Sequence, residues 1–82
     1  MIVKYFAWLK IITEIDQEII EDTSVIDVKT LMEFLLKKYP KLKTYIESKD
    51  LIRIAINHSY TFDNDKIQEN DEVALFPPVS GG

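Results

Sequence analysis

Cysteine is absent from this 82-residue sequence, and histidine occurs once, at His58. Without cysteine the chain forms no disulfide, offers no thiolate to a metal and has no cysteine nucleophile. One imidazole does not make a histidine-based metal site by itself, so we expect no metal centre. Asn57 and Ser59 flank His58, which indicates a solvent-facing turn or strand end.

Glycine is nearly absent as well, because the two glycines of the chain are Gly81 and Gly82. A phosphate-cradling loop of the GxxxxGKS or GxGxxG kind is therefore excluded. The sequence shows no Ser-His-Asp arrangement with an oxyanion loop and no pair of carboxylates assignable to a cleft. We expect the chain to bind no cofactor and to have no catalytic side chains. Any step that uses ATP would therefore take place on an activating partner.

Long apolar runs are also missing, and the amino terminus lacks the charged-then-apolar layout of a signal peptide. We therefore expect a cytoplasmic protein that binds no membrane. A net charge of −4 argues against nucleic acid and favours a basic protein partner. Residues 63–72 hold five acidic groups and one lysine. Such a run is usually a solvated rim, and here it is also a candidate for steering the tail toward a positive surface.

The carboxyl-terminal run is the main clue to function. Average glycine usage predicts a Gly-Gly end in only about 0.5% of unrelated chains. Glycine has no Cβ atom, so a Gly-Gly end can pass through a channel that is too narrow for side chains. With polyproline geometry, residues 77–82 can project roughly 15–20 Å beyond the folded domain. The competing interpretation is a frayed end. The tail that we expect to enter a partner consists of Pro77, Pro78, Val79, Ser80, Gly81 and Gly82, and it ends in a carboxylate.

Alternation and β-branched residues predict a strand over residues 1–11, with a return over residues 18–21 as a hairpin. Lys4 and Lys10 mark one face of this first strand as the wetter one. Phe6 and Trp8 share that face and are therefore expected to be partly exposed.

The period changes between Asp27 and Tyr39, where apolar residues recur at spacings of three and four. Asp27 is the expected N-cap and Pro40 the expected end of the helix. One more short turn is predicted at residues 42–46. Further strands are predicted at residues 51–57, 60–62 and 72–76, and Asn70 is expected to take left-handed backbone angles before the last of them.

A single main helix between hairpin-like pairs predicts an α+β domain, with the helix packed on a mixed sheet. The commonest such layout is the ubiquitin-like β-grasp, in which the first and last strands lie side by side. We expect a β-grasp domain over residues 1–76 and an extended, flexible tail over residues 77–82.

Three segments of the sequence carry a family resemblance: the run at residues 70–82, which ends Phe-Pro-Pro-Val-Ser-Gly-Gly, and residues 5–9 and 55–57. They resemble the small subunit of molybdopterin synthase, a β-grasp sulfur carrier. The resemblance implies that an activating enzyme adenylates the Gly82 carboxylate and converts it to a thiocarboxylate. The tail then enters the large, catalytic subunit, and sulfur passes to cyclic pyranopterin monophosphate during molybdenum cofactor biosynthesis. It also implies partner contacts at Phe6, Tyr60 and Phe76, which we expect to form one exposed patch near the exit of the tail.

The sequence departs from this family at Asn70, where glycine is usual, and at Lys10-Ile11, where Arg-Glu is common. Residues 58–65 match only in outline. Two alternatives share the fold and the diglycine: a carrier that delivers sulfur to thiamine or transfer RNA, and a ubiquitin-like modifier joined through Gly82 to lysines of other proteins. The Phe-Pro-Pro sequence at residues 76–78, which leads into the tail, favours the molybdopterin carrier.

Overall fold

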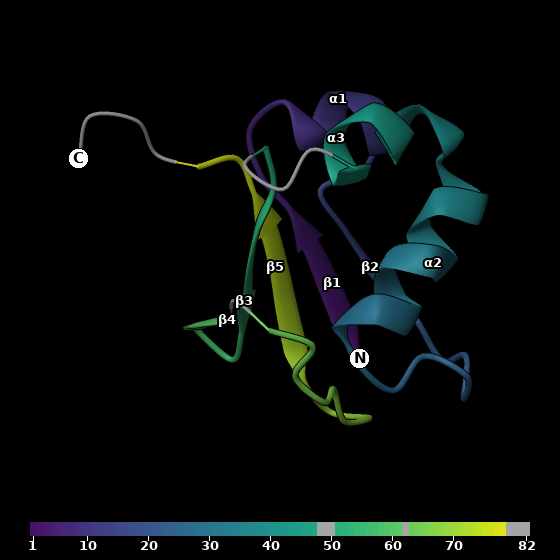
Figure 1. Cartoon of the computed structure of the whole chain (residues 1–82), viewed down its shortest axis with the longest axis vertical. Coiled ribbons are helices and arrows are strands. Elements are labelled where there is room, and N and C mark those ends of the chain that lie inside the picture. The colour runs from purple at the N-terminus through teal and green to yellow at the C-terminus, as the bar shows by residue number, and fades with distance from the viewer. Residues whose placement is uncertain (48–50, 62, 79–82) are drawn as a thin grey trace.

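The first and last strands of the chain lie side by side at the centre of the sheet (Figure 1). β1 (Ile2–Tyr5) pairs in parallel with β5 (Glu72–Phe76). The remaining strands are β2 (Gln17–Ile19), β3 (Arg53–Ile56) and β4 (Ser59–Thr61), and the order across the sheet is β2-β1-β5-β3-β4. The structure is a computed structural model that describes residues 1–47, 51–61 and 63–78. The predicted α+β class with a mixed sheet is confirmed.

The predicted central helix is α2 (Val28–Lys38), and its N-cap is Asp27 as expected. Asp27 Oδ1 accepts a hydrogen bond from the Thr30 N–H at 2.9 Å, and Thr30 Oγ1 accepts one from the Asp27 N–H at 3.1 Å. These reciprocal bonds form a capping box, which satisfies amide groups that a helix start leaves without a partner. Pro40 follows the helix and opens the 3-10 turn η1 (Pro40–Leu42).

The helices cover one face of the sheet (Figure 1). A short helix, α3 (Lys43–Glu47), follows η1 and accounts for the short turn predicted at residues 42–46. Alternate residues of the two central strands point to the helical side and meet the apolar residues of α2. The fully buried apolar side chains are Val3, Tyr5, Leu9, Leu31, Leu35, Leu42, Val73 and Leu75. Burial of each large side chain contributes about 1.5–3 kcal/mol, so this layer holds the helices on the sheet.

The prediction of a strand over residues 1–11 is wrong beyond Tyr5. Ala7 has a left-handed backbone angle, with φ at 55°, and the helix α1 (Leu9–Thr13) follows. Leu9 and Thr13 are its buried residues, and their spacing of four is that of one helical face. Thr13 Oγ1 also donates a hydrogen bond to the Leu9 carbonyl at 3.2 Å. The apolar residues after Tyr5 thus follow the helical period, which the strand pattern concealed.

Asn57 and His58 form the two-residue turn between β3 and β4, with φ angles of 50° and 70°. Two positive φ angles give the turn that matches the twist of paired strands, and asparagine tolerates them well. His58 is exposed in this turn, as its polar neighbours predict. β4 begins one residue earlier than expected, and Phe62, the last residue predicted for this strand, lies outside the described residues.

The backbone of Asn70 does not take the left-handed angles expected for it. The turn before β5 is instead closed by Gln68 and Asp71. The Gln68 N–H donates to Asp71 Oδ2 at 2.7 Å, and the Asp71 N–H donates to the Gln68 carbonyl at 3.1 Å. A side chain therefore supplies the closure for which a glycine-like conformation was predicted.

Candidate partner-binding surface at the exit of the tail

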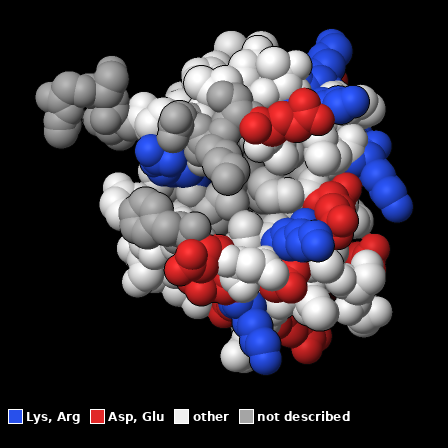
Figure 2. All heavy atoms as spheres, in the orientation of Figure 1, with Lys and Arg blue, Asp and Glu red and all other residues white. Residues whose placement is uncertain are grey.

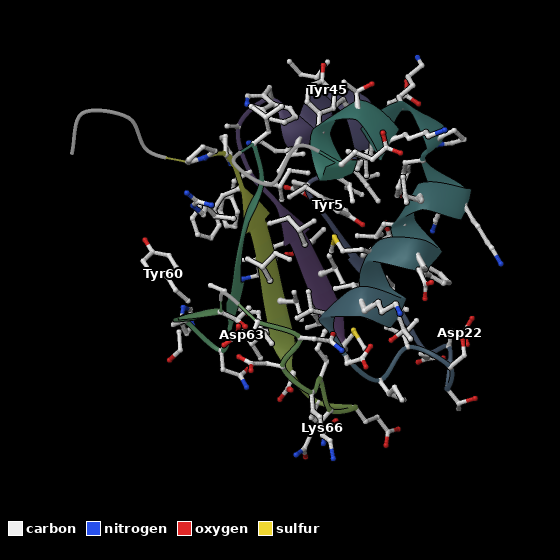
Figure 3. The ribbon with its side chains drawn as sticks, viewed as in Figure 1. Tyr5, Asp22, Tyr45, Tyr60, Asp63 and Lys66 are labelled. Carbon is white, nitrogen blue, oxygen red and sulfur yellow. The ribbon has the colours of Figure 1, made fainter. Side chains whose placement is uncertain are left out.

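Three aromatic side chains lie on or beside the sheet face that the helices leave open: Phe6, Tyr60 and Phe76, here called the aromatic patch. Phe6 is 45% exposed, Tyr60 is 67% exposed and Phe76 is half-buried. The rings of Tyr60 and Phe76 are in contact, with centroids 5.6 Å apart and planes inclined by 40°. Figure 3 shows Tyr60 on the side of the sheet away from α2. The exposure predicted for Phe6 and Tyr60 is confirmed.

Strand register brings the patch together from three distant parts of the sequence. The Phe6 N–H donates to the Leu75 carbonyl at 3.0 Å, so the chain still follows β5 for one residue after β1 ends. On the other side of β5, the β3 and β4 ladders place Tyr60 opposite Ala55, and Ala55 opposite Ala74. Two small side chains therefore separate Tyr60 from β1 across the open face, and its large ring leans toward Phe76.

The expected tail is described only at its start. Pro77 and Pro78 follow directly after β5 and are half-buried. Val79, Ser80, Gly81 and Gly82 lie outside the described residues. Because β5 is the middle strand of the sheet, the chain leaves from the end of a central strand, beside Phe76 of the aromatic patch.

The acidic segment 63–72 lies at the other end of the sheet, because β5 runs from Glu72 at that end to Phe76 at the exit (Figure 1). Nearness in sequence to the tail is therefore not nearness in space, and the hypothesis that this segment steers the tail is not supported by its position. Glu72 instead lies 3.1 Å from Lys4 Nζ and 3.4 Å from His58 Nε2. Arg53 is the register partner of Phe76, and Figure 2 shows a basic side chain at the root of the tail.

A polar network joins the sheet to α2, and it was not among the features predicted from the sequence. Glu18 Oε2 accepts hydrogen bonds from the hydroxyls of Tyr5 and Tyr39, each at 2.6 Å, and Glu18 Oε1 pairs with Lys38 Nζ. The Glu18 side chain is only 9% exposed. Tyr5, Glu18 and the adjacent pair Lys38-Tyr39 come from three parts of the chain that are 13 to 21 residues apart, so no local pattern marks them.

The network shifts the pKa values of its members. Burial by itself would raise the pKa of Glu18, but the hydrogen bonds from Lys38, Tyr39 and Tyr5 outweigh burial and lower it. Burial, followed by the hydrogen bond to Glu18, raises the pKa of Tyr39 to about 12 and that of Tyr5 further still. Figure 3 shows Tyr5 between the sheet and the helices, so this cluster stabilises the junction of the sheet with α2.

Sequence reasoning also missed the exposed residue Ile11, which is 78% exposed on α1. The spacing of Leu9, Ile12 and Thr13 was the signal available for this helix, since residues three and four apart share one helical face.

Within residues 1–47, 51–61 and 63–78, no cluster of metal-binding side chains is found. The same ranges contain no helix with the length and apolar character needed to cross a membrane.

A mixed sheet with a parallel central pair, covered on one face by a capped helix, defines a ubiquitin-like β-grasp protein. The predicted fold is thus confirmed, and solved structures of the same fold support it. Residues 3–82 match the sequence model of the ThiS family. The chain belongs to the ThiS family.

Individual relatives agree with the resemblance found in the sequence. The molybdopterin synthase sulfur carrier subunit of Arabidopsis thaliana is 37% identical over 51 residues, which are 62% of this chain. The match spans half the length of that relative. A structure of a putative molybdopterin converting factor, subunit 1, from Pyrococcus furiosus has a TM-score of 0.82 and 32% identity over 95% of each chain. The small archaeal modifier protein 1 of Methanosarcina acetivorans has a TM-score of 0.77 and 28% identity, over 99% of this chain and 94% of that one.

Proposed function

We propose that this protein is the sulfur carrier subunit of a molybdopterin synthase and donates the sulfur used in molybdenum cofactor biosynthesis. The observation that carries the proposal is the position of the exit: the central strand β5 ends beside the aromatic patch, so Pro77 and Pro78 follow directly after an exposed apolar surface. Membership of the ThiS family and the likeness to the sulfur carrier subunit of Arabidopsis thaliana support it.

The proposed chemistry takes place on the terminal carboxylate of Gly82. The carboxylate attacks the α-phosphate of ATP in an activating partner, which gives the acyl-adenylate and pyrophosphate. A sulfide-level sulfur donor then attacks the carbonyl carbon and displaces AMP, leaving a thiocarboxylate. On the large subunit the terminal sulfur attacks a carbon of cyclic pyranopterin monophosphate, and the new C–S bond replaces a C–O bond of that carbon, whose oxygen group leaves. Hydrolysis of the resulting thioester leaves the sulfur on the precursor and restores the Gly82 carboxylate.

The division of labour in this proposal follows from the composition of the chain. A loop for ATP phosphates needs glycines before the tail, and this sequence has none there. The chain contributes the acyl group, its delivery and a binding surface, whereas the partners contribute ATP binding, general acid–base groups and the precursor site.

A two-stage assay with Gly81→Ala tests the proposal. Intact mass after incubation with the activating enzyme and ATP should show the replacement of one oxygen by sulfur in the wild-type protein, and the reconstituted synthase should then convert the precursor. Gly81→Ala keeps the terminal carboxylate but adds a methyl group and removes most positive-φ conformations. We expect unchanged folding and a slower rate in one or both stages. Wild-type rates in both stages would contradict passage of the tail through narrow channels.

A second test concerns the aromatic patch. Truncation of a central aromatic contact usually costs more than about 1 kcal/mol, so Tyr60→Ala should weaken binding to the large subunit by roughly tenfold. Glu33→Ala is the matched control, because Glu33 is also exposed but lies on α2, on the other side of the sheet from Tyr60. Equal affinities for the two variants in a calorimetric titration would show that the patch is not the interface.

A second candidate function is favoured by one observation, the structural likeness to a small archaeal modifier protein. In that function the activated Gly82 carbonyl is attacked by a lysine amine, which forms an isopeptide bond and releases AMP. Tryptic peptides with a Gly-Gly remnant on lysine, found in cells that express the tagged chain, would establish it. The ThiS family also leaves thiamine and transfer RNA as sulfur acceptors, which product analysis with each precursor would distinguish.

A further inference from the structure

A groove of about 750 Å³ opens at the end of the sheet opposite the exit of the tail. Apolar residues form most of its walls, and we call it the basal groove: it is lined by Met1, Ile2, Ile19, Val25, Ile26 and Ile67, with a rim described below. Its volume is in the range typical of sites that hold a ligand or a partner's side chains. Neither the aromatic patch nor Pro77 and Pro78 contribute to it.

Exposed aliphatic side chains gather around this groove. Ile19 is 68% exposed, Ile26 is 57% exposed and Ile2 is 38% exposed, while Val25 and Ile67 form a buried floor. Register explains part of this arrangement, because Ile2 and Ile19 are paired on the first two strands. Single exposed apolar residues are common on protein surfaces, but a contiguous cluster of them around a groove is typical of interaction sites.

The polar rim of the groove has one sign of charge. Among the lining residues, Glu21, Asp22 and Glu69 have carboxylates, and none is lysine or arginine. Asp22 Oδ1 accepts hydrogen bonds from the N–H and the hydroxyl of Ser24, at 2.8 and 2.6 Å, and these bonds lower the pKa of Asp22. The Met1 ammonium is the cation of the lining, and it donates to the Ile20 carbonyl at 3.0 Å in a buried position. Lys66 precedes Ile67 at the same end of the molecule but does not line the groove (Figure 3).

We propose that the basal groove binds an apolar segment flanked by lysine or arginine on a second protein partner. The aliphatic side chains would be covered by the apolar part of the segment, and the carboxylates of the rim would attract the flanking cations. This surface and the exit of the tail lie at opposite ends of β5 (Figure 1). The partner would therefore bind while the tail is engaged elsewhere, and the inference does not depend on the proposed sulfur transfer.

Titration of the ¹⁵N-labelled full chain with a capped peptide, Lys-Lys-Leu-Ala-Ile-Leu-Lys-Lys, tests the proposal. We expect amide shifts confined to Ile2 and to residues 19–26 and 67–70. We also expect weaker binding when salt is raised from about 0.05 M to about 0.5 M, because screening shortens the range of the rim charges. Two control peptides separate the contributions: one with glutamate in place of each lysine, and one with a serine-glycine centre between the lysines. Both should bind at least about tenfold more weakly.

Ile19→Lys should abolish the shifts, because it places a cation on the apolar wall. Ile11→Lys is the matched control, since Ile11 is also highly exposed but lies on α1. The spectrum of each free variant shows whether it folds. If Ile19→Lys does not fold, Ile26→Lys replaces it in the test. Shifts centred on Phe6, Tyr60 and Phe76, or equal binding of Ile19→Lys and Ile11→Lys, would overturn the proposal. A dimer of the chain that is lost in Ile19→Lys would overturn it too, because the occupant would then be a second copy.

Discussion

Glu18 is the residue whose environment departs furthest from what its sequence position suggests. It lies on a three-residue edge strand between two exposed residues, yet its carboxylate accepts hydrogen bonds from Tyr5, Tyr39 and Lys38. A buried carboxylate is stable only when its oxygens have hydrogen-bond donors, and here three side chains supply them. Glu18 therefore fixes β2 and the end of α2 to each other through polar contacts, next to the apolar core.

The variant Glu18→Gln should lower the free energy of unfolding by about 1.5–3 kcal/mol near pH 7, the usual contribution of hydrogen bonds to a charged group. The folded-state pKa of Glu18 is lowered. Its contribution is thus present above the unfolded value of about 4.3 and is lost as the pH falls through the folded pKa. Urea denaturation across this range should show the two proteins converging at low pH. Glu33→Gln, at an exposed position on α2, is the control, and a difference that persists in acid would contradict the assignment.

At the scale of elements, α2 owes its start to Asp27 and to a distant asparagine. Asn64 Oδ1 accepts from the Lys29 N–H at 2.7 Å, and Asn64 Nδ2 donates to Asp27 Oδ2 at 3.2 Å. The loop before β5 thus completes the cap of the main helix. This contact joins the start of α2 to the loop before β5, beside the isolated bridge between Asp27 and Lys66.

Asp27→Ala removes the capping box and the contact with Asn64, and we expect a loss of about 1 kcal/mol in unfolding free energy, within the range of 0.5–2 kcal/mol for N-caps. Thermal and urea unfolding measure it. Asp22→Ala is the matched control: the side chain of that aspartate accepts hydrogen bonds from Ser24 in the exposed loop before the helix, so its loss should cost less. Equal losses for the two variants would show that the cap is not the source.

At the scale of the whole molecule, stability and the proposed activity occupy different parts of the chain. The buried core is contained in residues 1–75, whereas the proposed reaction takes place at Gly82. The sheet keeps one face for the helices and leaves the other for the aromatic patch. A carrier with this division can lose its reactive end without losing its fold.

Deletion of residues 79–82 should therefore change the unfolding free energy by no more than a few tenths of a kcal/mol, as surface changes usually do. The same deletion should abolish acquisition of sulfur, because the terminal carboxylate would move to Pro78. Calorimetric melting and intact mass after activation measure the two effects. A large fall in melting temperature would mean that the tail packs on the domain and is not a free arm.

Local patterns in the sequence determined much of this protein. The cap at Asp27, the helical spacing up to Tyr39 and the alternation in the last strand are set by neighbouring residues, and they are enough to predict the β-grasp. The absence of cysteine and of internal glycine is a property of composition, and it limits the chemistry of the chain whatever fold the chain adopts.

Tertiary structure decided the rest. The apolar run after Tyr5 fits both a strand and a helix, and the choice depended on where Leu9 and Thr13 could be buried. Tertiary structure also separates the acidic segment from the tail, because β5 runs from one end of the sheet to the other. It likewise brings to Glu18 hydrogen-bond donors that belong to other elements. The basal groove also exists only after the first strands and the segment at residues 67–70 meet. Burial and pairing between distant segments decided these features, and no short stretch of sequence specifies them.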